Sequence, residues 1–184
     1  MFRLPLRDGV ELRLVEERQA DAIFTAVEQN RDYLREWLLW VDATTGAQPV
    51  VEFIRKTLHQ FAENRGFAAG IWAAGRFIGS VGFHNIDWVN RKVEMGYWLD
   101  REQQGKGIMH DACRVMIQHA FEELKLNRVE IRCALGNGSS NRVAQRLGFR
   151  LDGTLRGAHL LYGEYHDLNI YGLLASEWEE RNQE

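Results

Sequence analysis

Two glycines flank a lysine in the segment QQGKGI, residues 103–108. An apolar run, VEMGYWL (93–99), precedes the segment, and a long amphipathic stretch, IMHDACRVMIQHAFEEL (108–124), follows it. This pattern predicts a turn between a strand and a helix. The first turn of a helix has unpaired N–H groups and a partial positive charge, and glycine lets the backbone approach a ligand closely. With the charge of Lys106 added, such a turn suits a phosphate or pyrophosphate, although a tight turn that needs glycine only for its geometry would look the same.

Two common phosphate-binding motifs do not fit the sequence. In a P-loop the lysine is followed by serine or threonine, whereas Lys106 is followed by glycine. The segment LGNGSSN (135–141) also joins a predicted strand to a predicted helix, but it lacks the third glycine of the dinucleotide fingerprint and the acid that follows it. A P-loop enzyme and a Rossmann enzyme are therefore not expected.

The cysteines and histidines do not form patterns typical of a metal site or a disulfide. Cys133 alternates with Val129, Ile131 and Leu135, which predicts a core position rather than a nucleophile. Cys113 also falls on an apolar face, so both cysteines are expected to be reduced thiols. Four histidines lack the spacing of metal ligands, and no metal is predicted: His84, His110, His119 and His166.

The elements around the turn follow from the periodicity of apolar residues. Period-two and short apolar runs predict strands, and helical spacing predicts helices. Strands are expected at 10–15, 67–74, 76–86, 92–99 and 128–135, and helices at 17–30, 31–40, 50–66, 105–124 and 139–147. A strand, a long helix and another strand form a right-handed crossover, so 92–99 and 128–135 should be parallel neighbours. The predicted fold class is α/β, with a mixed, mostly antiparallel sheet flanked by helices.

Length and composition favour one soluble domain. The 184 residues suit a single domain, 1–184, and the formal net charge of −3 gives no reason to expect nucleic acid as a partner. No apolar run approaches the roughly 18 residues of a membrane span, and the start of the chain lacks the apolar core of a signal peptide. We therefore expect a cytoplasmic protein with no membrane partner.

Several ordered segments together resemble a known family. They are RDYLREWLLW (31–40), GYWLDREQQGKGIM (96–109), N-G-S-S-N-x-V-A-x-R-L-G-F (137–149) and GEYHDLNIY (163–171). They resemble the GNAT superfamily of N-acetyltransferases, and within it the group of ribosomal-protein N-acetyltransferases of the RimJ/RimL type. The resemblance implies a sheet whose two central parallel strands splay apart, with acetyl-CoA as cosubstrate in the opening. It implies that the turn holds the pyrophosphate and that the strand 95–99 pairs with the pantetheine arm, whose amides can bind a strand edge.

The resemblance also assigns roles to individual residues. The cofactor-binding set it implies is Tyr97, Trp98, Leu99, Gln104, Gly105, Lys106, Gly107, Ile108, Met109, Asn137 and Asn141. Asn137 would face the cofactor, and Ser140 would donate a proton to the departing CoA thiolate. The alternative is that Ser139 or Ser140 only caps the helix that follows.

The general base has two candidates. RimL-like relatives carry a glutamate where this chain has His159, and histidine can accept a proton near neutral pH. Glu94 is the other candidate, because many members of the superfamily use a carboxylate on this strand; it could equally be a structural acid.

The acceptor is the least determined part of the reaction. An α-amine has a pKa about 2.5 units below that of a lysine amine, which lowers the work of deprotonation by about 3.5 kcal/mol. A site without an obvious strong base therefore favours a protein N-terminus, such as that of a ribosomal protein, over a lysine. One alternative acceptor is a small amine, for which Asp32, Glu36 and Asp42 could form an acidic cleft. The other alternative is that the protein is a non-catalytic acyl-CoA-binding module.

Aromatic residues are common in the predicted acceptor region. They could line the acceptor pocket or belong to the core: Tyr33, Trp37, Trp40, Trp88 and Trp98. Together with the oligomeric state that the resemblance implies, these aromatic residues favour a homodimer.

Overall fold

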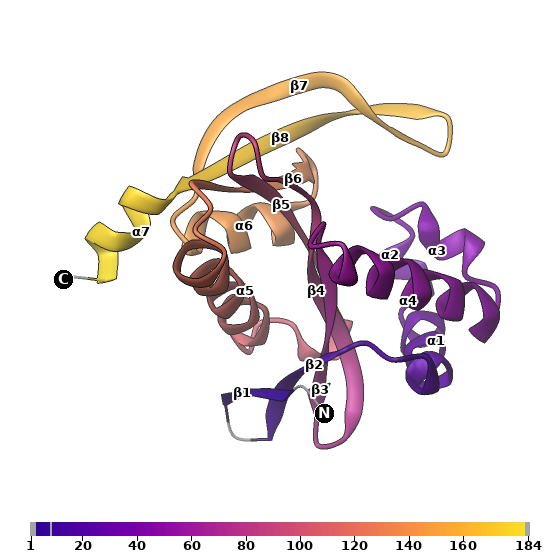
Figure 1. Cartoon of the computed structure of the whole chain (residues 1–184). Helices are drawn as coiled ribbons and strands as arrows, with labels where there is room; N and C mark the ends of the chain where they lie inside the picture. The colour runs from indigo at the N-terminus through magenta and orange to yellow at the C-terminus, as the bar shows by residue number, and fades with distance from the viewer. Residues whose placement is uncertain (1–2, 8, 183–184) are drawn as a thin grey trace.

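An eight-stranded sheet forms the centre of the protein, with strand order β1-β2-β3-β4-β5-β6-β8-β7 (Figure 1). The structure is a computed structural model that describes residues 3–7 and 9–182. The strands are β1 Arg3–Arg7, β2 Val10–Leu14, β3 Phe67–Ala73, β4 Arg76–Asp87, β5 Lys92–Leu99, β6 Arg128–Ala134, β7 Arg150–Leu161 and β8 Glu164–Leu174. Among the described residues, only β5 and β6 pair in parallel and the other neighbouring strands are antiparallel, which confirms the predicted mixed sheet.

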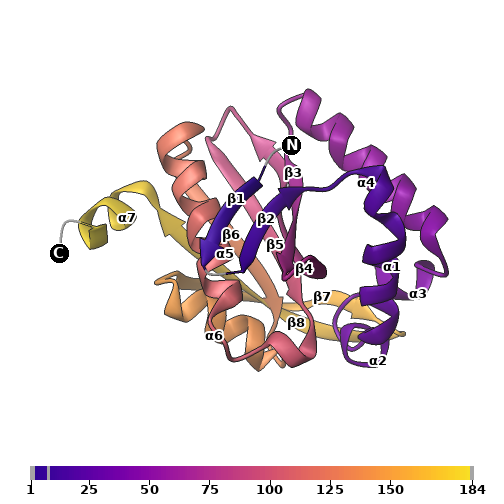
Figure 2. The same cartoon turned by 90° about the horizontal axis from the view of Figure 1, so that it is seen from below.

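Helices cover both faces of the sheet (Figures 1 and 2). The α-helices are α1 Ala20–Gln29, α2 Arg31–Leu34, α3 Trp40–Ala43, α4 Ala47–Ala62, α5 Ile108–Gln118, α6 Gly138–Arg146 and α7 Ala175–Asn182. Short 3₁₀ turns η1 and η2 span Glu17–Gln19 and Arg101–Gln103, and α5 continues into a π-turn, η3, at His119–Glu123. Helices α1 to α4 lie on one side of the sheet, and α5 and α6 lie on the other (Figure 1). None of the helices in the described ranges is long and apolar enough to cross a membrane.

The alternation of side chains along the strands divides the interior into two main cores. The larger core lies under α5 and includes Val93, Met95, Val129, Ile131 and Cys133. The second core packs α1 and α4 against the opposite face, through Ile23, Ile54, Trp72 and Phe77. Both cysteines are free and buried, as predicted.

The prediction of one continuous helix at 31–40 is wrong. Helix α2 ends at Leu34, and α3 begins only at Trp40. The Arg31 guanidinium donates to the carbonyls of Val41 (2.7 Å) and Thr44 (2.6 Å), and these bonds hold α3 folded back against α2. The helical spacing of apolar residues carries no information about such a contact between two helices.

Two helix boundaries and one strand also differ from the prediction. Helix α4 begins at Ala47 rather than 50, and Pro49 is tolerated in its first turn, where an N–H would have no intrahelical acceptor. Helix α5 begins at Ile108 rather than 105, since Gly105 and Gly107 have left-handed φ values of 74° and 78°. Strand β1 was not predicted.

The two central parallel strands separate after a short paired segment, as the resemblance implied. Strands β5 and β6 pair at Lys92–Arg128, Val93–Val129 and Glu94–Glu130. Beyond Glu94, residues 95–99 pair with β4, whereas the rest of β6 pairs with β8. One edge of residues 95–99 is therefore without a partner strand among the described residues.

Candidate active site

The glycine turn between β5 and α5 has the geometry of an anion site. Gly107 is the N-cap of α5, so the turn ends where the unpaired N–H groups of the helix begin. The left-handed φ values of Gly105 and Gly107 would strain any other residue. Lys106 Nζ donates to Gln103 Oε1 at 3.1 Å, and this bond holds the lysine side chain at the turn.

Arg7 of β1 braces this turn from outside. Its Nη1 donates to the carbonyl of Lys106 at 2.7 Å, and its Nε donates to Asp111 Oδ2 at 2.8 Å. In a planar trans peptide the C=O and the next N–H point in opposite directions. Because Arg7 binds the carbonyl of Lys106, the N–H of Gly107 points away from Arg7 and is free for a ligand. No sequence pattern pointed to the pairing of Arg7 and Asp111, because they lie 104 residues apart.

The start of the same loop is fixed by α1 and α2. Asn30 Oδ1 accepts a hydrogen bond from the N–H of Arg101 at 2.9 Å, and the Tyr33 hydroxyl donates to the carbonyl of Leu99. Burial raises the pKa of Tyr33, so its hydroxyl stays protonated. Asp100, which is 4% exposed, accepts from the N–H of Glu102 and pairs with Arg76. The carboxyl end of β5 is therefore held rigidly beside the open strand edge.

Ser140 faces the opening between β5 and β6 from the first turn of α6. The Tyr97 hydroxyl lies 3.1 Å from Ser140 Oγ and donates to the Ser140 carbonyl at 3.2 Å, so the pair spans the opening. Burial raises the pKa of Tyr97, which keeps its phenol neutral. Burial also raises the pKa of the Cys133 thiol, in keeping with its predicted core role.

Asn137, not a serine, caps α6. Its Oδ1 accepts a hydrogen bond from the N–H of Ser140 at 3.1 Å, and the helix begins at Gly138. The alternative that Ser139 or Ser140 is the N-cap is therefore wrong. The Ser140 hydroxyl is therefore not used for capping, and it contacts the Tyr97 hydroxyl instead.

Asn141 ties α6 to the sheet. It is 8% exposed, and its Nδ2 donates to the carbonyls of Ala134 (3.0 Å) and Asn137 (2.7 Å). Its Oδ1 accepts from Asn169 Nδ2 (2.8 Å) and the Tyr171 hydroxyl (2.9 Å). A contact between this side chain and a cofactor would have to replace one of these bonds, so its cofactor role stays a prediction.

On the opposite face of the sheet, Glu94 lies beside a second titratable residue, His84. Glu94 is opposite His84 in the β4–β5 register, and its Oε2 lies 3.4 Å from Arg132 Nε. The His84 ring lies over Gly96, where an added Cβ would approach His84 Nε2 to 2.5 Å. Desolvation lowers the pKa of His84 and favours a neutral imidazole. The sequence pattern allowed His84 to be weighed only as a metal ligand, because nothing in the sequence indicates its position over β5.

His159 lies on β7, opposite His166 of β8. Within the described residues, no hydrogen bond joins His159 to Ser140 or Glu94. Its role as the base stays a prediction, as does that of Glu94.

The aromatic residues divide between the core and the surface. Trp98 packs against Phe77 and against Trp40, with centroid distances of 5.8 and 6.2 Å, and Trp40 is 42% exposed. The Trp37 ring lies next to Gly136, at the carboxyl end of β6. Trp88 instead donates to the carbonyl of Asn64, away from this cluster. Trp37, Trp40 and Trp98 therefore remain the candidates for an acceptor pocket.

Comparison with known proteins agrees with this geometry. Residues 10–150 match the family described as "Acetyltransferase (GNAT) domain". The chain belongs to this family and is an N-acetyltransferase. It is similar to the putative ribosomal N-acetyltransferase YdaF of Bacillus subtilis, with 39% identity over 180 residues that cover 97% of this chain and 98% of YdaF.

Two further relatives place the chain near the ribosomal-protein acetyltransferases. It is 31% identical over 172 residues to the ribosomal-protein-serine acetyltransferase of Escherichia coli, covering 91% of this chain and 94% of that protein. It is also similar to a solved structure of the ribosomal α-N-protein acetyltransferase RimL in complex with coenzyme A. The TM-score is 0.91 at 27% identity, over 96% of this chain and 99% of the other. The predicted resemblance is confirmed.

Proposed function

We propose that the protein transfers the acetyl group of acetyl-CoA to the N-terminal α-amine of a protein, specifically a ribosomal protein. The observation that carries the proposal is the edge of residues 95–99 that has no partner strand among the described residues; it precedes the braced glycine turn and includes Tyr97, which contacts Ser140. The printed functions of the relatives and the coenzyme A complex of RimL support the choice of cosubstrate and acceptor.

The residues present suit the parts of acetyl-CoA. The N–H groups at the start of α5 would bind the pyrophosphate, and the open edge of 95–99 would pair with the pantetheine amides. Ser140 would donate its proton to the thiolate as the C–S bond breaks, and Tyr97 would hold the serine hydroxyl in place. A base on the acceptor side, for which His159 and Glu94 are the predicted candidates, would take the proton from the attacking amine.

A small amine is the second candidate acceptor. An acidic cleft would favour it, and Asp32, Glu36 and Asp42 are the acids in question. Asp42 pairs with Arg35 at 3.1 Å, so part of this acidic charge is neutralised by the protein itself. This pairing favours the peptide acceptor over a polyamine.

Transfer assays with a matched panel test the proposal. Purified protein and acetyl-CoA are mixed with a peptide that has a free N-terminus, the same peptide with a blocked N-terminus and an internal lysine, or spermidine. Release of free CoA and the peptide mass are measured. We expect acetylation of the free N-terminus alone. Turnover of spermidine alone would favour the small-amine reading, and cofactor binding without turnover of any amine would favour the non-catalytic module.

We further propose that residues 1–184 form one domain that works in the cytoplasm as a homodimer. Exposed apolar side chains on the β7–β8 side of the sheet support self-association: Leu151, Leu155, Leu160 and Tyr165. Sedimentation equilibrium measures the mass in solution, and a monomer at micromolar concentration would refute the dimer.

A further inference from the structure

The imidazole of His84 reaches across β5 on the sheet face that lies away from α5. His84 is opposite Glu94 in the β4–β5 register, but its ring extends diagonally over Gly96, where an added Cβ would approach Nε2 to 2.5 Å. The φ angle of Gly96 is not in the left-handed region, so the backbone there does not require glycine. What the absent side chain provides is room for the imidazole beside residues 95–99, whose edge is open.

The two ring nitrogens of His84 are available to a ligand. The side chain is exposed on this face, and neither nitrogen has a hydrogen bond within the described part of the chain. Two charged groups face the ring: Glu94 of β5 favours its protonated form, and Lys56 of α4 disfavours it. Desolvation by the surrounding protein is the largest effect and lowers the pKa of His84, so the ring is neutral at pH 7 and can accept a proton.

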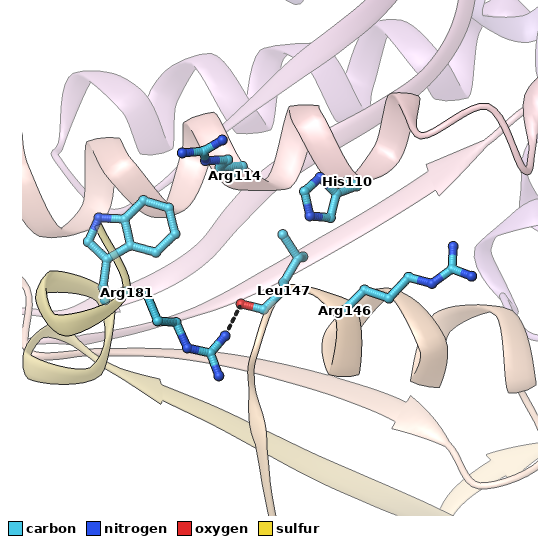
Figure 3. Close-up of a pocket in the computed structure, with 6 residues that line it drawn as sticks. His110, Arg114, Arg146, Leu147 and Arg181 are labelled. Carbon is cyan, nitrogen blue, oxygen red and sulfur yellow. Dashed lines mark hydrogen bonds between the residues drawn. The ribbon is translucent and has the colours of Figure 1, made fainter. Parts of the chain in front are cut away.

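Four other histidines lie elsewhere in the fold. His110 lines a cavity between α5, α6 and α7, together with one arginine from each of these helices, on the other side of the sheet (Figure 3). His119 is in the π-turn that continues α5. His159 and His166 are opposite each other on β7 and β8, which the strand order separates from β5 by β6. Among these five histidines, only His84 has a ring that lies over the open strand.

The His84 ring lies on the same face as the candidate acceptor pocket. Gly96 and Trp98 are two residues apart on β5, so they share a face of the sheet and lie about 7 Å apart along the strand. Trp98 contacts Trp40, with 6.2 Å between the ring centroids. An amine held at these indoles would therefore be next to an imidazole that can accept its proton.

The proton donor lies on the other face of the same strand. The side chain of Tyr97 packs against the larger core, on the α5 side, and its hydroxyl lies 3.1 Å from Ser140 Oγ. A proton acceptor and a proton donor thus flank residues 95–99 from opposite faces. Acyl transfer needs such a separation, because the amine must lose a proton while the thiolate gains one.

We propose that His84 Nε2 accepts the proton of the attacking amine and that Glu94 stabilises the imidazolium so formed, an inference that rests on the proposed function. The neutral amine attacks the thioester carbonyl carbon, the N–C bond forms, and the nitrogen gives one proton to His84. The C–S bond then breaks, and the thiolate takes the proton of Ser140. The exposed imidazolium releases its proton to water, and Ser140 recovers one from water. Glu94 acts beside the base, since its carboxylate is already paired with Arg132 at 3.4 Å.

The pH dependence of kcat/KM for a peptide with a free N-terminus tests the role of His84. In wild type, log kcat/KM should change with a slope of about 1 below the amine pKa of about 8, and of about 2 below the pKa of His84. His84→Gln should lower kcat/KM at pH 7 by about 10²-fold, as loss of a general base does, and keep the slope of about 1 throughout. His59→Gln, at an exposed position of α4, is the control and should keep the wild-type profile.

Gly96→Ala tests the placement of the ring. The added methyl group would displace the imidazole, and we expect kcat/KM to fall by up to about 10²-fold, the effect of misplacing a catalytic group by about 1 Å. In the His84→Gln background the same change should cost less than about twofold, because no imidazole remains to be displaced. Equal losses in the two backgrounds would overturn the proposed placement. Thermal melting of each variant checks that the fold is intact.

The outcomes separate this inference from the proposed function. A slope of about 2 that persists in His84→Gln, or a kcat/KM near that of wild type, would overturn the role of His84 and leave the acetyl transfer in place. Loss of the steeper limb in His159→Gln alone would likewise overturn it and assign the base to β7. Wild-type protein that binds acetyl-CoA in calorimetry but acetylates no amine would instead refute the proposed function, and the base with it.

Discussion

Ser140 combines three features that a proton donor to a thiolate needs. Asn137 takes over the capping of α6, the Tyr97 hydroxyl lies 3.1 Å from Ser140 Oγ, and the serine is at the opening between β5 and β6. A neutral phenol, kept so by burial, can hold the serine hydroxyl without competing for negative charge. The role of Ser140 stays a prediction, which this local geometry supports.

Ser140→Ala should lower kcat and kcat/KM together. A proton donor to the leaving group acts in the transition state, and such donors contribute about 10² to 10⁴ in rate. Steady-state kinetics measure the loss, and calorimetry should give nearly the wild-type affinity for acetyl-CoA. Ser139→Ala, at the exposed neighbouring position, is the control and should keep wild-type kcat. Equal kcat in the two variants would show that Ser140 has no part in the chemistry.

His84 should make the stability of the protein depend on pH. Desolvation lowers its folded pKa below the usual value of 6.5, although Glu94 opposes the shift and Lys56 adds to it. The unfolded chain then binds more protons between the folded pKa and 6.5, so the free energy of unfolding falls as pH falls through this window. Urea unfolding at several pH values should show this loss in wild type and a smaller loss in His84→Gln. His119, whose pKa is also lowered by burial, is present in both proteins and cancels in the comparison. Parallel curves would mean that His84 titrates normally.

At the scale of elements, the first strand of the sheet is bonded to the glycine turn. Strand β1 and helix α5 are far apart in the sequence, and Arg7 joins them by binding Lys106 and Asp111. The turn is exposed and rich in glycine, so its peptides need a partner to hold their orientation. Arg7 supplies this partner through the carbonyl of Lys106.

Arg7→Gln should weaken acetyl-CoA binding more than it weakens the fold. Loss of the bond to Lys106 frees the peptide before Gly107, and we expect the affinity to fall by roughly three- to tenfold, the effect of one hydrogen bond. The partly exposed pair with Asp111 contributes at most about 1 kcal/mol to stability. Calorimetry and thermal melting measure the two effects. Arg3→Gln removes the same charge from the same strand and should leave binding unchanged; an equal loss in both variants would point to a general charge effect.

On the scale of the whole molecule, the opening divides the sheet into two parts. Strands β1 to β5 form one antiparallel part, and β6, β8 and β7 form the other. Three parallel residue pairs and the larger core under α5 join them. A cofactor in the opening would therefore contact both parts at once.

Hydrogen exchange should detect this closing of the sheet. In the free protein, the amides of residues 95–99 that point away from β4 have no partner strand, and they should exchange rapidly. Saturating acetyl-CoA should slow their exchange, whereas amides bonded to β4 should change little. Protection spread evenly over all strands would indicate general stabilisation by binding instead of pairing at this edge.

Patterns that repeat within a few residues were enough to predict most of the fold. Alternating apolar residues gave the strands at 67–74 and 92–99, and the strand–helix–strand order gave the parallel neighbours β5 and β6. The glycine turn and the NGSSN segment marked the two sides of the opening because backbone conformation at a helix start depends on local residues.

The sequence by itself thus determined the family, the mixed sheet and the location of the glycine turn. Only the tertiary structure decided which side chains meet: Arg7 with Lys106, Tyr97 with Ser140, His84 with Gly96, and the arginines of three helices around one cavity. It also decided that α2 and α3 are separate, through the bonds of Arg31. The physical reason is the distance along the chain over which each kind of interaction acts. Periodicity and turn geometry are fixed by neighbours along the chain, whereas these contacts join residues that approach each other only when the sheet and its helices have packed.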